Sequence, residues 1–447
     1  MSPRAVATHL LAAVTGASIC GVLWWQAHTD HASTVARMQR RLTLLQDDNE
    51  RLRGLVEKGQ RTQKLGSDKV LRDGIEKAVV QIRGLDFKQP VNYNVLSRDE
   101  IKAVVSKKLA EVYSEEEFNN MSAAFQRLGL LPENYPLRQS YIDLLGEQIA
   151  AFYDQHQHKL FMFEDASLEN SQNRVVLAHE LAHALQDQHF GLKKLPLEIK
   201  NNDDRAIASS ALVEGEATLV MSEFMLKNLT LGTLKDTVTS SLSQNMEQLQ
   251  KAPRFLRESL VFPYLRGQEF CSVLFARGGY DAISRAYTQP PSSSAQILHP
   301  EKFLAEPREE PLPVEWTDTR IDGEDPTQDN VLGEFGARML IAEYCNGSLA
   351  EKAAEGWRGD RYLSFGSGEA LVWKTLWSTP EDAAEFYSAH KTVWETRYRP
   401  AQSTQGEDSY KADAPRALRM VRKDSSVMII DASTAARAEQ LVQHFGR

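Results

Sequence analysis

The chain has 447 residues, which is too long for one compact core, so two folded domains are expected in addition to whatever the N-terminus carries. The formal net charge is −9, and the basic residues are spread along the chain, which excludes the concentrated positive patch of a nucleic-acid-binding protein. Cys20, Cys271 and Cys345 form no CxxC pair, which excludes a thiolate zinc site and a dense disulfide framework and leaves the pairing of Cys271 with Cys345 open.

Residues 1–27 are predicted to be a transmembrane signal anchor. Residues 5–25 contain no Asp, Glu, Lys or Arg, and about 20 such residues span the hydrocarbon core as a helix. Trp24 and Trp25 suit the membrane–water interface, and no small-residue pair follows where a signal peptidase would cut. Arg4 favours a cytoplasmic N-terminus, so a single-pass protein with its bulk on the periplasmic side is expected.

Residues 33–58 are predicted to be a coiled-coil stalk, because apolar residues alternate four and three apart. The seam consists of Val35, Met38, Leu42, Leu45, Asn49, Leu52 and Val56. A single Asn in such a seam sets the register of parallel two-stranded coils, which indicates a homodimer. The alternative is one amphipathic helix that packs on its own catalytic domain.

A catalytic domain is predicted over residues 66–306. Periodicity and capping residues predict helices over 69–83, 98–112 and 115–128, a strand over 91–96, and a β-hairpin from 148–153 and 160–163.

The segment that follows the hairpin contains the pattern His179-Glu180-Leu181-Ala182-His183. Two histidines four residues apart lie on one face of a helix and can bind one cation. Imidazole and carboxylate ligands suit zinc, and a catalytic zinc keeps its fourth position for water. Glu180 lies about 100° around the helix from His179, where it can act as the general base on that water. One zinc ion per chain is therefore predicted, on a helix whose apolar neighbours indicate burial.

The third metal ligand is predicted to be Glu214, in the apolar segment 211–221 that is expected to form a second buried helix. Glu216 is the fallback carboxylate. His189 stands six residues after His183, as in metzincins, but their glycine at the third position after the second histidine is replaced by Gln186.

At these residues the chain resembles the gluzincins, the thermolysin-like branch of the zinc peptidases. The resemblance implies a zincin-like domain, mainly helical with a small mixed sheet, whose edge strand binds an extended substrate. Thermolysin-like enzymes have an Asp four residues after the glutamate ligand, where this chain has Thr218. Asp187 or Glu216 would then be the polar partner of a histidine ligand.

A broader resemblance, to a family of uncharacterised bacterial predicted metallopeptidases, spans most of the chain and implies no known substrate. The matching motifs are Arg83-Gly84-Leu85, His179-Glu180-Leu181, Gln186-Asp187-Gln188 and the run from Gln296 to Lys302.

A peptidase also needs a donor to the oxyanion of the tetrahedral intermediate. His299, between Leu298 and Pro300, and Tyr264, after Pro263, are the two candidates. The alternative interpretations are a surface histidine and a packed core tyrosine.

Residues 307–330 are acidic and rich in proline, which predicts a linker or a long surface loop, and residues 331–447 are predicted to form a small α+β domain. Helices are expected at 333–344, 380–393 and 434–445, strands at 370–377, 417–421 and 427–430, and a loop at 358–360. The fold class of the whole chain is therefore α+β.

The function predicted from these features is that of a membrane-anchored zinc endopeptidase acting on a peptide or protein substrate. One alternative is a metal-stabilised, catalytically inactive binding or scaffold protein of the cell envelope. The other is a structural envelope protein without metal, which requires that the buried histidines find hydrogen-bond partners.

Overall fold

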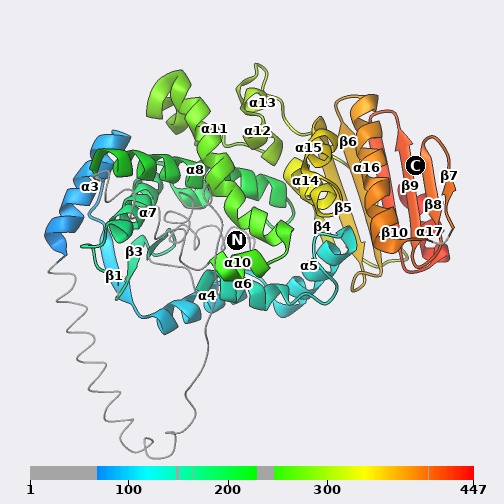
Figure 1. Cartoon of the computed structure of the whole chain (residues 1–447), viewed down its shortest axis with the longest axis horizontal. Coiled ribbons are helices and arrows are strands. Elements are labelled where there is room, and N and C mark those ends of the chain that lie inside the picture. The colour runs from blue at the N-terminus through cyan, green and yellow to red at the C-terminus, as the bar shows by residue number, and fades with distance from the viewer. Residues whose placement is uncertain (1–67, 147–150, 165, 229–245, 401, 447) are drawn as a thin grey trace, which may run out of the picture.

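The computed structural model describes residues 68–146, 151–164, 166–228, 246–400 and 402–446. The anchor predicted for residues 1–27 and the stalk predicted for residues 33–58 lie outside these ranges, so both stay predictions. Within the described ranges, none of the helices combines the length and the apolar character that a membrane crossing requires. The architecture is α+β, as predicted (Figure 1).

The N-terminal part is mainly helical and occupies the left and centre of Figure 1. Its elements are α3 (Lys69–Arg83), β1 (Asn92–Leu96), α4 (Arg98–Val112), α5 (Glu115–Leu128), α6 (Leu137–Gly146), β2 (Ala151–Asp154), β3 (Lys159–Phe163), α7 (Ser171–Phe190), η1 (Leu192–Lys194), α8 (Asp203–Asn228), α10 (Met246–Lys251), α11 (Arg254–Ala286), α12 (Ser294–Leu298) and α13 (Pro300–Leu304). The helices predicted over 69–83, 98–112 and 115–128 are confirmed. Capping boxes at Ser97 and Ser114 begin α4 and α5, and left-handed Gly84 and Gly129 end α3 and α5.

The three strands of this part form a mixed sheet in the order β1-β3-β2. The predicted hairpin is confirmed as the antiparallel pair of β2 and β3, and β1 adds to β3 in parallel. β2 is an edge strand, and all four of its residues are buried. The sheet therefore presents a buried edge towards the helices.

The two long helices α8 and α11 pack at a glycine contact. A Cβ added to Gly215 of α8 would lie 2.1 Å from the backbone of Gly267 in α11, and one added to Gly267 would lie 2.2 Å from the Ala211 carbonyl oxygen. The backbones meet directly because neither glycine carries a side chain. This contact holds the turn of α8 that bears Glu214 against α11.

The C-terminal part is a seven-stranded antiparallel sheet with helices on both faces, on the right of Figure 1. Its elements are β4 (Gln328–Asn330), α14 (Gly333–Tyr344), α15 (Gly347–Ala354), β5 (Trp357–Phe365), β6 (Ala370–Trp377), α16 (Pro380–Tyr398), β7 (Thr404–Gln405), β8 (Ser409–Ala412), β9 (Ala417–Lys423), β10 (Ser426–Ala432) and α17 (Ala435–Phe445). The strand order is β4-β5-β6-β10-β9-β8-β7.

A hairpin followed by a helix occurs twice in this sheet, as β5-β6-α16 and as β9-β10-α17. Phe386 of α16 packs on Trp373 on one face, whereas Phe445 of α17 packs on Phe365 on the other. The alternation of side chains along the strands therefore divides the core into two layers.

The segment 307–330 is not a free linker, which corrects the prediction from its prolines. Residues 328–330 form β4 and pair with β5, Val314 and Ile321 are buried, and the Leu312 N–H donates to the Arg358 carbonyl. Residues 358–360 are not a loop but part of β5, where the buried Asp360 carboxylate accepts from the Leu332 and Gly333 amides and from two tryptophan indoles.

One buried core cluster includes residues of both parts, and a second, smaller cluster lies wholly within the C-terminal part. The Arg397 guanidinium on α16 donates to the carbonyls of Gln126 and Arg127 at the end of α5, at 2.7 and 2.8 Å. Cys271 and Cys345 are both free thiols.

Substitution of Gly215 by Ala should lower the free energy of unfolding by about 3 kcal/mol or more, because the new methyl group meets the backbone of α11. The control is Gly74→Ala in α3, where an added Cβ meets nothing within 4 Å, and which should raise stability by roughly 0.5–1 kcal/mol. Urea unfolding of the full chain measures both. Equal effects of the two substitutions would contradict the packing described.

His390 lies on the buried face of α16, between Trp373 and Trp394, and both of its ring nitrogens lack a hydrogen-bond partner. Burial, with a smaller contribution from Arg397, lowers the pKa of His390 to about 3. In the unfolded chain His390 is protonated near pH 6.5, whereas in the folded chain it stays neutral. The free energy of unfolding should therefore fall as the pH drops below 7, by about 2 kcal/mol at pH 5. His390→Phe should remove this part of the acid destabilisation. An unchanged pH dependence of unfolding in the variant would contradict it.

Candidate metal centre

The central helix α7 is buried on all sides. Asn170 caps its first turn by accepting from the Gln172 amide, and Gly191 ends it in a left-handed conformation. Every residue from Val175 to Asp187 is buried. A helix without a solvent face must satisfy its polar side chains internally, which makes its two histidines and its glutamate informative.

The three predicted ligands converge on one point. His179 Nε2 lies 3.0 Å from His183 Nε2 and 3.2 Å from Glu214 Oε2, and His183 Nε2 lies 3.3 Å from the same oxygen. Within the described ranges these three residues form a group able to hold a metal ion, and all three are buried. The predicted ligand set is thus brought together by α7 and α8.

The dimensions of this triangle suit a small tetrahedral cation. Bonds of about 2.0–2.1 Å, as zinc makes to nitrogen and oxygen, place neighbouring ligand atoms about 3.3 Å apart. The observed separations of 3.0 to 3.3 Å lie close to that value. Two imidazoles and one carboxylate also leave a fourth position for water, so these residues fit the ion that the pattern predicts.

Glu180 lies beside the triangle but is not part of it. Its Oε2 accepts from the Tyr153 amide of the edge strand β2 at 2.8 Å, whereas its Oε1 has no hydrogen-bond partner although the residue is fully buried. Burial, opposed by His183 and reinforced by the neighbouring Glu214, raises the pKa of Glu180 to about 8. The carboxyl group is therefore poised to hold or release a proton near neutral pH.

His183 shows how strongly the two carboxylates act on the site. Burial alone would lower the pKa of His183, but Glu214, with Glu180 and Gln186, raises it to about 9. A cation bound in the triangle would take over the role of that proton, since a metal ligand must be a neutral imidazole.

The outer nitrogen of His183 is bound by Gln186. His183 Nδ1 lies 2.8 Å from Gln186 Oε1, and Gln186 Nε2 donates to Glu216 Oε2 at 2.9 Å. Glu216 in turn pairs with Arg83 and accepts from the Tyr287 hydroxyl. The fallback ligand Glu216 thus lies outside the triangle.

Asp187 ties the hairpin to the metal helix. Its Oδ2 accepts from the Tyr153 hydroxyl at 2.9 Å and pairs with His158 Nδ1 at 2.7 Å, and its Oδ1 accepts from the Leu192 amide. Asp187 and Glu216 are both predicted as partners of a histidine ligand. Asp187 instead binds the β2–β3 hairpin, whereas Glu216 is linked to His183 through Gln186.

The other predicted site residues have different surroundings. His189 pairs with the Asp86 carbonyl at 2.8 Å. His299 lies between α12 and α13 and pairs with Glu334 Oε1 at 2.6 Å. Tyr264 is fully buried in α11, and its ring centroid lies 6.1 Å from that of His179. Tyr264 therefore lies beside His179 of the triangle, whereas His189 pairs with a backbone carbonyl and His299 with a carboxylate of α14.

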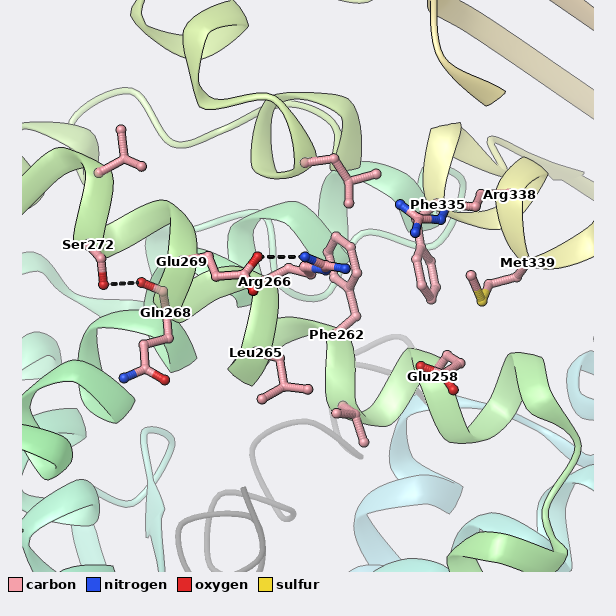
Figure 2. Close-up of a pocket in the computed structure, with 13 residues that line it drawn as sticks. Glu258, Phe262, Leu265, Arg266, Gln268, Glu269, Ser272, Phe335, Arg338 and Met339 are labelled. Carbon is pink, nitrogen blue, oxygen red and sulfur yellow. Dashed lines mark hydrogen bonds and ion pairs between the residues drawn. The ribbon is translucent and has the colours of Figure 1, made fainter. Parts of the chain in front are cut away.

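A cavity of about 720 Å³ lies between α11 and α14, away from the metal triangle (Figure 2). Phe262, Leu265 and Arg266 line it from α11, and Phe335 and Met339 from α14. α11 thus turns Tyr264 towards His179 and other side chains towards this cavity, which contains none of the predicted site residues.

The part of the chain with a family match is the C-terminal sheet. Residues 319–442 match the model of a domain of unknown function (DUF8575). The match begins inside the segment predicted as a linker, in agreement with the packing of that segment on β5, and it does not reach the metal triangle. No curated protein and no solved structure matches the chain.

The full chain should bind one zinc ion, which Glu214→Gln should remove because the amide cannot supply the charged ligand. His189→Ala should keep the zinc, because His189 pairs with a backbone carbonyl away from the triangle. Metal analysis of the purified proteins measures both. Zinc retained without the Glu214 carboxylate, or lost with His189, would show that the ligand set is different.

Proposed function

We propose that the protein is a zinc-dependent endopeptidase that hydrolyses peptide bonds with Glu180 as the general base. The observation that carries the proposal is the buried triangle of His179, His183 and Glu214, with the free Oε1 of Glu180 beside it. The gluzincin resemblance of the same residues supports it. Membrane anchoring through residues 1–27, a homodimeric stalk over residues 33–58 and a periplasmic location belong to the proposal and rest on the sequence.

A zinc ion held by the triangle would supply a water of lowered pKa and polarise the scissile carbonyl. Glu180 would take the proton of that water and pass it to the leaving amine. Oε1 of Glu180 has no hydrogen-bond partner within the protein, so it is available to accept that proton.

Two further groups of this chain would contribute. The Tyr153 amide holds Glu180 Oε2 and so orients the other oxygen. Tyr264, which lies against His179, would donate to the oxyanion when its hydroxyl turns to the substrate. His299 is the weaker candidate for that role because it is paired with Glu334.

The second candidate is a metal-stabilised protein without catalytic activity, which the complete burial of the site favours. His179, Glu180 and Glu214 are 0% exposed and His183 is 2% exposed, so a substrate reaches the triangle only after a rearrangement. A small hydroxamate added to the Co²⁺-loaded protein separates the two candidates. A shift of the visible spectrum would support the open fourth position of an enzyme, and no shift would support the structural metal.

Glu180→Gln should lower the rate of cleavage of a labelled unstructured protein such as casein by at least about 100-fold and leave the zinc content unchanged, because the amide cannot accept a proton. The control is Glu133→Gln, which changes an exposed carboxylate in the loop between α5 and α6 and should leave the rate unchanged. Cleavage by the Glu180 variant at the wild-type rate would overturn its role as the base.

A further inference from the structure

Gln186 joins the two helices that bear the metal ligands. It lies one turn after His183 on α7 and is 2% exposed. Its Nε2 donates to the Val213 carbonyl and to Glu216 Oε2, both at 2.9 Å, and its Oε1 lies 2.8 Å from His183 Nδ1. Val213 and Glu216 flank the ligand Glu214 on α8.

These contacts fix the orientation of the amide. A backbone carbonyl and a carboxylate both accept hydrogen bonds, so the nitrogen of Gln186 must face Val213 and Glu216. The Oε1 atom must then face the His183 ring, which makes His183 Nδ1 the donor. His183 Nε2, which faces His179 and Glu214, is then the nitrogen that remains free to bind the metal.

Glu216 is itself held from the opposite side. Arg83 on α3 forms an ion pair with Glu216 Oε1, and the Arg83 side chain also donates to Ser284 on α11 at 2.8 Å. Tyr287 donates to Glu216 Oε2. A buried carboxylate with an arginine and a hydroxyl as partners keeps one position, and through Gln186 it keeps the ring of His183 in one position as well.

We propose that Gln186 and Glu216 are positioning residues that set His183 as an Nε2 ligand and lock α7 to the turn of α8 that carries Glu214. This inference rests on the proposed metal centre. A neutral amide suits this place, because Glu180, Glu214 and Glu216 already bring three buried carboxyl groups together and a fourth would add to their repulsion.

The test compares zinc affinity, by competition with a chelator, in the full chain and in three variants. Gln186→Met keeps the length of the side chain and removes its three hydrogen bonds, to His183, Val213 and Glu216. Glu216→Gln keeps an acceptor for Gln186 but removes the charge. The matched control is Gln188→Met, on the same helix, whose amide pairs with the Gln89 backbone instead.

Gln186→Met should weaken zinc binding about 10- to 100-fold, the range found when the partner of a metal-binding histidine is removed. Glu216→Gln should weaken it less, and Gln188→Met should leave it unchanged. The visible spectrum of bound Co²⁺ should shift in the first variant and not in the control, which a general loss of stability would not produce.

A folded Gln186→Met variant with wild-type affinity and an unshifted Co²⁺ spectrum would overturn the inference, as would an equal loss in the Gln188→Met control. If Gln186→Met does not fold, the affinity of Glu216→Gln decides, and an unchanged value overturns the inference. A wild-type chain that binds no zinc would instead defeat the proposed function, so the two failures are distinguishable.

Discussion

The burial of charge between α7 and α8 is the constraint on which the rest of the structure depends. Two carboxyl groups, Glu180 and Glu214, and two imidazoles lie out of contact with solvent. An isolated charge in such a place is prohibitively costly, so the group must be neutralised or paired. The raised pKa values of Glu180 and His183, about 8 and 9, show protons filling this role in the bare chain. A divalent cation fills it with one ion.

The scaffold around this pair of helices removes their freedom to move apart. Gly215 and Gly267 allow α8 to meet α11 backbone to backbone, which leaves α8 one position against its neighbour. On the edge strand β2, the Tyr153 amide donates to Glu180, and the Tyr153 hydroxyl donates to Asp187 on the same helix α7. Each ligand-bearing element is thus fixed by contacts on more than one side, which is what a site of defined geometry requires.

The C-terminal sheet is part of the same body. Asp360 of β5 holds the first amides of α14, and α14 packs on α11, the helix that carries Tyr264. The family match to residues 319–442 starts before β4, and its first residues include Ile321, which is buried with Phe365 and Phe445 in the core layer beneath α17. This packing makes the sheet a support for the helices around the triangle of His179, His183 and Glu214.

The sequence predicts what is local and misses what depends on tertiary contact. Serine caps and helical periodicity predict the bounds of α4 and α5 to the residue. The His179 to His183 pair depends only on helix geometry, and Glu214 is found because its neighbours are apolar. In contrast, the sequence does not predict the long helix α11, because Pro263 and Gly267 lower its helix propensity. It also does not predict the start of β5, because charged residues flank Gly359. Both elements are stabilised by tertiary packing. The link from His183 to Glu216 depends on the rotation of α8 against α7, which no spacing reveals. Only the position of Gln186 on the face of His183 hints at it.

X-ray absorption at the zinc edge of the purified full chain tests the central claim most directly. The account predicts one zinc per chain with a first shell of nitrogen and oxygen at about 2.0–2.1 Å and the outer-shell scattering of two imidazole rings. Folded protein without zinc, or zinc with a sulfur ligand at about 2.3 Å, would contradict it, because the triangle of His179, His183 and Glu214 contains no thiolate.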